Sequence, residues 1–395
     1  MVGDWRSHRG SGLSWRDKTV LITGATGFIG GRVCERLFQA GVKNVRALVH
    51  TPHRAARIAR LPIELCPGSL LDRASLRAAL GKSQIVIHCG LGIGRGIVDG
   101  TRNLLEASQA AGVERFVHIS TAAVYGLTPK PGSETEDAPL PHTGEPYCDN
   151  KGRAERVVLN FGRRGLPVVI LRPSIVYGPY SAWSTRLIPD LKEGRVSLID
   201  GGKGSCNITY VDNLIDAVFL SIENQQALGQ AFFITDGETI TWGDFIQAHA
   251  NMLGNGRPLP NLSLQEIRDH YSRQPGMVTG SLKATRDALR SREFRQMLLR
   301  IPATKKVLDG LWHWSASLDD KSRARLRSQV GIRPSPPIAS NHTRWIPDAE
   351  TVATQTTSIF FSIEKARRLL GYKPRIPFAQ GIALVEQWLR FGNYL

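Results

Sequence analysis

One short stretch near the start of the chain, residues 19–30, constrains the fold more than any other. It begins with an apolar run typical of a buried strand, residues 20–22, and ends in three glycines spaced G-x-x-G-x-x-G. Gly24 permits a tight turn, Gly27 lets backbone N–H groups approach an anion, and Gly30 lets the following helix pack closely. A turn without a ligand is the alternative. The order of strand, glycines and helix predicts a dinucleotide site.

The composition excludes several classes of protein. The chain has 395 residues, of which 42% are hydrophobic and 22% charged, as in an ordinary soluble globular protein. It has no apolar run long enough to span a membrane, and its N-terminus has no apolar segment typical of a secretory signal. The five cysteines are scattered without a C-x-x-C pair. We therefore expect reduced thiols in a cytoplasmic protein, with neither a disulfide framework nor a metal site.

The formal net charge of +17 is unusual for a metabolic enzyme. Such a charge allows an acidic substrate, an anionic membrane surface or nucleic acid as partner. No nucleic-acid-binding motif accompanies it, and the arginines are spread widely along the chain. We therefore expect no nucleic acid partner.

The end of the second predicted strand, residues 45–50, bears on the choice of cofactor. In dinucleotide-binding folds an acidic residue at this point holds the 2′-hydroxyl of the adenosine ribose. Here Val49 and His50 take that place and Arg54 follows, so no acid would repel a 2′-phosphate and a cation lies nearby. The sequence favours NADP, with NAD as the alternative. The other interpretation is that these are surface residues of a basic protein.

Apolar runs and helical segments alternate beyond this point. Further strands are predicted at residues 63–66, 85–89 and 115–120, and helices near 73–80 and 98–111. This alternation predicts an α/β fold with a Rossmann-type, doubly wound parallel sheet and right-handed crossovers. A glycine-rich loop that begins at Gly90 closes the fourth strand, and it reads equally well as a cofactor contact or as a plain loop.

The fifth predicted strand leads to a candidate acid/base pair. It ends at Ser120 and Thr121, and after a proline-rich loop Tyr147 and Lys151 stand four residues apart on a predicted helix, where they share one face. A lysine ammonium beside a phenol lowers the pKa of the tyrosine towards the working range of a general acid/base. The Thr121 hydroxyl could hold the same substrate oxygen. A Y-x-x-x-K pair alone is mostly structural, but its place after the glycine turn predicts catalysis.

Further segments complete this pattern. Together with Tyr147 and Lys151 they are TGATGFIG (23–30), DGTRNLL (99–105), STAAVYG (120–126), RPSIVYGP (172–179), YVDN (210–213) and SIEKARRLLGY (362–372). The chain resembles the extended short-chain dehydrogenases/reductases of the NAD-dependent epimerase/dehydratase superfamily. The resemblance covers residues 17 to about 255 and resumes at 362–372.

The resemblance implies roles for individual residues. Tyr147 would exchange a proton with the substrate, Lys151 would lower the pKa of Tyr147 and hold the nicotinamide ribose, and Thr121 would polarise the substrate oxygen. The residues expected to bind the cofactor are Gly24, Thr26, Gly27, Phe28, Ile29, Gly30, His50, Arg54, Gly90, Ser120, Tyr147, Lys151, Pro173 and Ile175.

The resemblance also implies the domain organisation. Residues 16–181 would form the dinucleotide-binding domain, with 205–237 returning to it. Residues 182–204 and 238–395 would form a smaller, α-rich C-terminal substrate region that includes a basic helical insertion at 256–350.

Departures from the family pattern bear on the substrate. Ala122 and Ala123 stand where sugar dehydratases carry two acids, which argues against dehydration. The segment around Asn207 lacks the arginine that grips the diphosphate in nucleotide-sugar enzymes, although Arg186 or Arg195 could replace it, and it is closer to the 3β-hydroxysteroid dehydrogenase-like branch. We expect an NAD(P)-dependent oxidoreductase or epimerase acting on a secondary alcohol or ketone of a nucleotide sugar. The alternatives are a lipid or sterol-like hydroxyl and a non-catalytic dinucleotide-binding sensor.

The insertion is the least explained part of the sequence. Residues 283–327 carry twelve cations and five anions, and residues 294–301 have the apolar spacing of an amphipathic helix. A helical cap over the substrate cleft is the first interpretation, and a helix lying on an anionic membrane is the second. Residues 334–337 and 351–357 are predicted to be connecting loops. We expect a small-molecule substrate and a homodimer, with peripheral contact at the inner face of a membrane as a further option.

Overall fold

The computed structural model describes residues 15–254, 256, 258–272 and 345–395. The contacts divide the chain into two compact units, residues 1–264 with 345–395 and residues 265–344. Of the second unit, the described residues 265–272 form most of helix α8 (Leu264–Ser272). All other described elements belong to the first unit.

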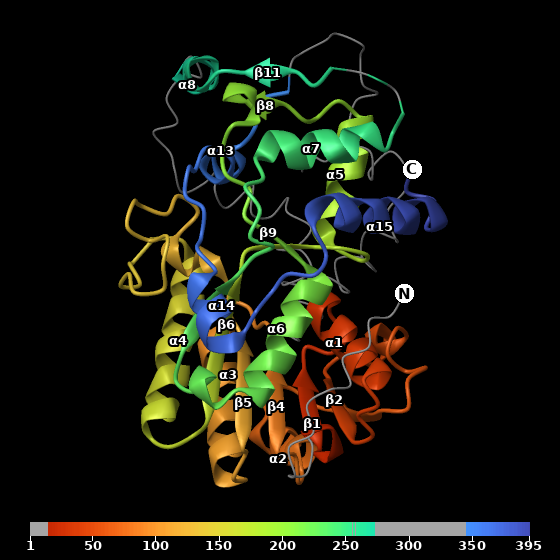
Figure 1. The fold of residues 1–395 in the computed structure, drawn as a ribbon, viewed down its shortest axis with the longest axis vertical. Coiled ribbons are helices and arrows are strands. Elements are labelled where there is room, and N and C mark those ends of the chain that lie inside the picture. Colours follow the sequence, from red (N-terminus) through yellow and green to blue (C-terminus); the bar gives the residue numbers. More distant parts are fainter. Residues whose placement is uncertain (1–14, 255, 257, 273–344) are drawn as a thin grey trace, which may run out of the picture. The chain divides into compact units, whose positions relative to one another are not determined.

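A seven-stranded parallel sheet forms the centre of the first unit (Figure 1). Its strand order is β10-β6-β5-β4-β1-β2-β3, and every neighbouring pair is parallel. The strands are β1 (Val20–Thr23), β2 (Val45–Val49), β3 (Glu64–Pro67), β4 (Ile85–His88), β5 (Arg115–Ile119), β6 (Val168–Pro173) and β10 (Ala231–Ile234). The predicted doubly wound sheet is confirmed. Strand order reverses between β1 and β4, which is where ligands bind in such sheets.

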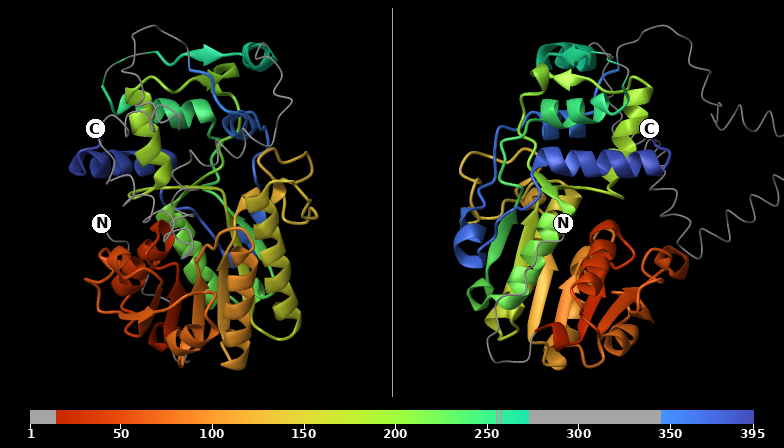
Figure 2. Two further views of the ribbon diagram at one scale, coloured as in Figure 1. Left: turned by 180° about the vertical axis from the view of Figure 1, so that it is seen from behind. Right: turned by 45° about the vertical axis from the view of Figure 1, so that its right-hand side comes forward.

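Helices cover both faces of this sheet (Figures 1 and 2). One face packs against α2 (Arg73–Leu80), α3 (Gly96–Ala110) and α4 (Pro146–Arg163), and the other against α1 (Phe28–Gln39) and α6 (Val211–Glu223). In β4, the Val86 side chain packs on the first of these faces, and the Ile85 and Ile87 side chains pack on the second. Because both faces are buried, the central strands read as continuous apolar runs in the sequence.

Shorter elements make up the rest of the first unit. Two pairs of parallel strands are β7 (Ile175–Tyr177) with β9 (Ile208–Tyr210) and β8 (Leu198–Ile199) with β11 (Asn261–Leu262). The helices are α5 (Ala182–Lys192), α7 (Trp242–Asn251), α13 (Ala349–Gln355), α14 (Glu364–Leu370) and α15 (Phe378–Phe391). The 3-10 helices are η1 (Trp15–Asp17), η2 (Pro52–Ala55), η3 (Ala122–Tyr125), η4 (Asp200–Gly202) and η5 (Gln225–Ala227). Figure 1 shows α5, α7 and α15 gathered above the main sheet.

The prediction of a connecting loop at residues 351–357 is wrong, because most of this segment belongs to α13. The Asp348 side chain caps the helix by accepting a hydrogen bond from the backbone N–H of Thr351 at 2.8 Å. The Thr354 hydroxyl donates to the backbone carbonyl of Glu350 at 2.8 Å, one helical turn earlier. Threonines that bond back onto their own helix remain compatible with helical structure, so the threonine content misled the sequence prediction.

Two other predictions, the basic segment 283–327 with its amphipathic helix and the loop at 334–337, lie outside the described residues. Among the described residues, no helix combines the length and apolarity needed to cross a membrane.

A buried ion pair ties α4 to β6. The Glu155 carboxylate is fully buried and accepts hydrogen bonds from Arg172 Nε at 3.1 Å and Nη2 at 2.7 Å. Arg172 Nη1 donates to the Tyr125 hydroxyl at 3.0 Å, and this hydroxyl donates to the backbone carbonyl of Ala138 at 3.0 Å. The pair therefore fixes both α4 and the proline-rich loop that precedes it.

We expect the substitution Glu155→Gln to lower the free energy of unfolding by about 3–5 kcal/mol, because it leaves the Arg172 charge buried without a counter-charge. The matched control is Glu106→Gln, which removes the more exposed ion pair between Glu106 and Arg73 and should cost less than about 1 kcal/mol. Urea unfolding of the two variants measures the difference. Equal losses would contradict this view of α4.

Candidate active site

The glycine turn is built by close approach of backbone to backbone. Gly24 has φ +68°, and a Cβ atom there would lie 2.5 Å from the carbonyl oxygen of Cys89. A Cβ on Gly30 would lie 2.3 Å from the carbonyl oxygen of Gly24. Helix α1 starts at Phe28, and Gly27 at its N-cap has no side chain to cap the first turn. This uncapped helix N-terminus fits a pyrophosphate, because it offers backbone N–H donors and the positive end of the helix dipole.

A chain of hydrogen bonds under the turn joins β1, β4 and α3. The Thr101 hydroxyl donates to the carbonyl of Ile97 at 2.7 Å, so it must accept from His88 Nε2 at 3.1 Å. His88 Nδ1 then accepts from the Thr23 hydroxyl at 2.6 Å, and Thr23 accepts from the backbone N–H of Gly90 at 3.3 Å. Burial lowers the pKa of His88 to about 3, which keeps the ring neutral in this tautomer. The chain holds Gly90 next to the glycine turn.

Sequence reasoning missed this chain. Its members Thr23 and His88 are the last residues of β1 and β4, and the sequence prediction placed His88 inside a strand without assigning either residue a role in hydrogen bonding. The neighbouring strand carries His118 in register with His88, and their ring centroids lie 5.1 Å apart. The sequence did contain one indication of this chain. The apolar runs of β1, β4 and β5 each contain a polar residue, Thr23, His88 and His118, and these three residues are in register in the sheet.

The structure brings Thr121 and Tyr147 together. Thr121 follows β5 and Tyr147 lies in the first turn of α4, and the Thr121 side chain is near enough to lower the pKa of Tyr147. Thr121 Oγ1 also accepts from the backbone N–H of Ala123 at 3.2 Å, which caps η3. On the helix side, the Asp149 carboxylate accepts from the backbone N–H of Thr143 at 2.8 Å and so ties the preceding loop to α4.

Lys151 is a buried cation. It is 4% exposed, and its Nζ donates to the carbonyl of Ile119 at 2.9 Å. Burial lowers the pKa of Lys151 to about 8, and the opposing effect of the nearby Glu155 is smaller. Glu155 already pairs with Arg172, so Lys151 makes no ion pair among the described residues. A buried ammonium without a salt bridge lowers stability, which is typical of a functional group.

The expected effect of Lys151 on Tyr147 is not found. Desolvation raises the pKa of Tyr147 above its ordinary value, although the residue is 44% exposed, and the neighbouring Thr121 side chain lowers it by less. The lysine amine is directed at Ile119 and is not among the causes of the shift. Tyr147 therefore holds its proton at neutral pH, which suits a proton donor.

The other predicted site residues occupy three places. A first group lies where strands of the main sheet end and where β7 begins, and consists of Gly90, Ser120, Pro173 and Ile175. A second group lies at the start of α1, and consists of Thr26, Phe28 and Ile29. His50 and Arg54 are exposed and follow β2, with Arg54 in η2. These residues gather at the carboxyl edge of the sheet. Their roles in binding stay predictions.

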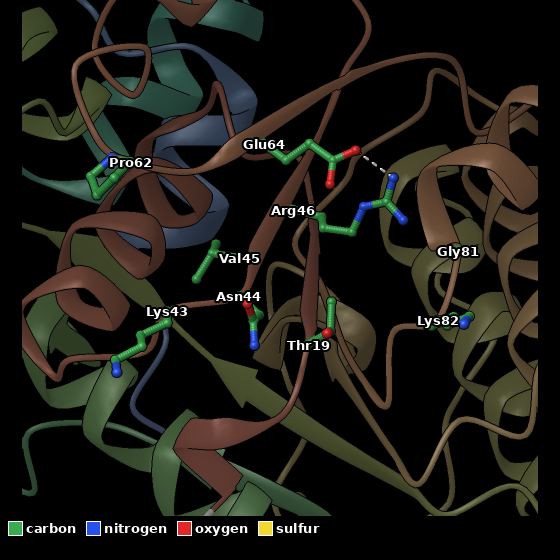
Figure 3. Close-up of a pocket in the computed structure, with 9 residues that line it drawn as sticks. All are labelled: Thr19, Lys43, Asn44, Val45, Arg46, Pro62, Glu64, Gly81 and Lys82. Atoms are coloured by element: carbon green, nitrogen blue, oxygen red, sulfur yellow. Dashed lines mark hydrogen bonds and ion pairs between the residues drawn. The ribbon is translucent and has the colours of Figure 1, made fainter.

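A cavity of about 450 Å³ lies at the opposite edge of the sheet (Figure 3). Residues around the amino ends of β1 and β2 line it, including Thr19, Lys43 and Arg46. The Arg46 guanidinium is held by Glu64 at 2.6 Å. None of the predicted site residues lines this cavity, so it is separate from the candidate active site.

Comparison with known proteins decides the family. The sequence model of the NAD dependent epimerase/dehydratase family matches residues 20–234, more than half of the chain. The chain belongs to this family. Its relatives include proteins named as a ketoreductase, a dehydrogenase and an epimerase, and the protein is an NAD(P)-dependent oxidoreductase or epimerase.

Three family relatives show the range of substrates. The 4-hydroxy-2-methyl-3-oxo-4-farnesyl-3,4-dihydroquinoline-1-oxide ketoreductase of Stigmatella aurantiaca is 26% identical over 63% of this chain and 77% of its own. A 3-beta-hydroxysteroid dehydrogenase of Mycolicibacterium neoaurum is 27% identical over 92% of this chain and 89% of its own. The UDP-glucuronic acid 4-epimerase of Bacillus cereus, solved with NAD, is 25% identical with a TM-score of 0.54, covering 62% of this chain and 87% of that one.

The substitution Gly24→Ala tests the turn. We expect it to raise the Kd for NADPH at least about tenfold, or about 1.4 kcal/mol, because the new methyl group meets the Cys89 carbonyl. The control Gly41→Ala has a similar φ of +78° but open space around it. It should cost about 1–2 kcal/mol of stability and leave the Kd unchanged. Fluorescence titration with NADPH measures both, and an unchanged Kd for Gly24→Ala would contradict the assignment.

The substitution Lys151→Met tests the buried ammonium. The pKa of Lys151 in the folded protein, about 8, lies below its ordinary value of 10.5, so between these two pH values the unfolded chain binds more protons and stability rises with pH. The variant lacks this rise. Its stability relative to the wild type should therefore fall by about 3 kcal/mol between pH 7 and pH 10.5. Urea unfolding across this range measures the difference, and a constant difference would show that Lys151 is not held in a desolvated site.

Proposed function

We propose that this protein is a ketoreductase, or the reverse alcohol dehydrogenase, that acts on a largely apolar substrate with NADP as its preferred dinucleotide. The observation that carries the proposal is the placement of Tyr147, whose pKa is raised above its ordinary value, beside Thr121 at the carboxyl end of β5. This edge of the sheet also carries the glycine turn. A proton donor at a dinucleotide site is what ketone reduction needs.

In the proposed reaction the chain moves a proton and orients the substrate, and the dinucleotide supplies the hydride when bound. Tyr147 donates its proton to the ketone oxygen as negative charge develops there. Thr121 holds the same oxygen through its hydroxyl. Lys151 carries a positive charge below pH about 8, and its role at the nicotinamide ribose stays a prediction.

Several observations support an apolar substrate. Leu91 and Ile93, in the loop after β4 that begins at the predicted cofactor contact Gly90, are 61% and 58% exposed. Two of the relatives act, by their names, on a farnesylated quinoline and on a steroid. Exposed apolar side chains near a predicted site are typical of a surface that binds an apolar ligand.

Other observations count against a diphosphate grip. Asn207, near the position of the missing arginine, is committed to the backbone: it donates to the carbonyl of Ile359 at 2.8 Å and accepts from the N–H of Phe361 at 2.9 Å. Arg195, one of the replacement candidates, is paired with Asp190 at 2.6 Å. We therefore place the apolar substrate ahead of the nucleotide sugar that the sequence favoured.

Epimerisation of a nucleotide sugar is the second candidate. The likeness to the UDP-glucuronic acid 4-epimerase supports it. An epimerase returns the hydride to its substrate, so it would leave the absorbance of the dinucleotide unchanged over a full turnover.

Other predictions concern cofactor choice and partners. The exposed His50 and Arg54 support NADP, because neither repels a 2′-phosphate. The domain boundaries, the homodimer, the cytoplasmic location and the peripheral contact with an anionic membrane stay predictions. The segment expected to make the membrane contact, within residues 283–327, lies outside the described residues.

The substitution Tyr147→Phe tests the proposed function. It removes the proton donor, so we expect kcat for ketone reduction to fall at least about 100-fold. The Kd for NADPH should stay within a factor of about two, because the phenyl ring remains. The assay follows NADPH absorbance with a panel of apolar ketones, and chromatography of nucleotide sugars checks the second candidate. Retained ketone reduction in the variant would refute the role of Tyr147.

A further inference from the structure

A row of three side chains joins the segment after β2 to α15. The Arg57 guanidinium lies 4.2 Å from the centre of the Tyr180 ring. The Tyr180 ring lies 4.9 Å from the Trp388 ring, centre to centre. Arg57 lies in the segment after β2, Tyr180 in the segment after β7, and Trp388 in α15. The row therefore links the segment after β2 to α15 through Tyr180.

Arg57 is fixed against the start of α1. It pairs with both oxygens of the Glu35 carboxylate, at 2.8 and 3.0 Å, and its Nη1 donates to the carbonyl of Phe28 at 3.4 Å. A Cβ on Gly31 would lie 3.3 Å from the same nitrogen, so a larger residue there would crowd the guanidinium. Because Glu35 already neutralises Arg57, we do not assign Arg57 as a phosphate ligand. It serves as a fixed platform beside the turn that fits a pyrophosphate.

Tyr180 adopts a backbone conformation that side chains rarely take, with φ +71°. A non-glycine residue in this region costs energy and persists where surrounding contacts hold it, often near functional sites. The ring is 48% exposed, so burial in the core does not account for its position. The contacts that hold it are the Arg57 guanidinium and the Trp388 ring.

We propose that Arg57, Tyr180 and Trp388 form a clasp that retards release of the bound dinucleotide, with Tyr180 as its positioning residue. On one side of the clasp lie Phe28 and the first turn of α1, and on the other lies the segment after β7. The first turn of α1 carries the predicted cofactor contacts Phe28 and Ile29, and the segment after β7 follows the predicted contact Ile175. The dinucleotide leaves when Tyr180 separates from Arg57, which breaks their cation–π contact. The inference rests on the proposed function, because it requires a bound dinucleotide.

The test uses the full-length protein and the rate of NADPH release. NADPH is bound first and chased with excess NADP⁺, and loss of its fluorescence is followed by stopped flow. The strength of cation–π contacts predicts a release about 2- to 30-fold faster in Tyr180→Leu than in the wild type. Tyr180→Phe keeps the ring and should release at the wild-type rate. Trp388→Leu should accelerate release as well, because it removes the contact on the other side of the ring.

The control is Phe38→Leu, which changes an equally exposed aromatic residue, 48% exposed, on α1 and outside the clasp. It should leave the release rate unchanged. Equal release rates for Tyr180→Leu and the wild type would overturn the clasp while the proposed function stands. Equal acceleration by Phe38→Leu would overturn it too, because general loosening would then explain both. If the wild type binds neither NADPH nor NADH, the proposed function and the clasp fail together.

Discussion

The close approach of two backbone segments underlies the rest of the site. Gly24 packs directly on the peptide between Cys89 and Gly90, at a distance that excludes any Cβ atom. The hydrogen bonds from Thr23 to His88 and from Gly90 to Thr23 hold Gly90 against Gly24. The protein's own contacts therefore set the shape of the glycine turn. Helix α1 can then begin directly after the turn with an uncapped N-terminus. A preformed anion site of this kind binds a pyrophosphate without reorganising.

The part of the site around Lys151 and Tyr147 contains a group that lowers the stability of the fold and is suited to a chemical role. Lys151 is buried without a salt bridge, while the adjacent Glu155 is committed to Arg172. An apolar residue in place of Lys151 would be less costly to bury. The Glu155–Arg172 pair fixes α4, and α4 carries both Lys151 and Tyr147. The same helix therefore supplies a rigid support and a group whose charge changes near neutral pH.

Much of the fold could be predicted, because strands buried on both faces appear as apolar runs separated by helical segments. The spacing of Tyr147 and Lys151 correctly placed them on one helix, but spacing does not show where an amine points, so the expected direction of the Tyr147 pKa was wrong. Threonines that bond to their own helix concealed α13. Contacts between residues far apart in the chain, such as Tyr180 with Trp388, leave no local pattern in the sequence.

The central claim is that this chain carries hydride chemistry at the carboxyl edge of its sheet, with Tyr147 as proton donor. The most direct measurement is isotope transfer from NADPH deuterated at its transferable position, with mass spectrometry of the product after incubation with apolar ketones. The account predicts one deuterium on the carbinol carbon of the alcohol formed. Binding of the dinucleotide without deuterium in any product, together with unchanged nucleotide sugars, would contradict it.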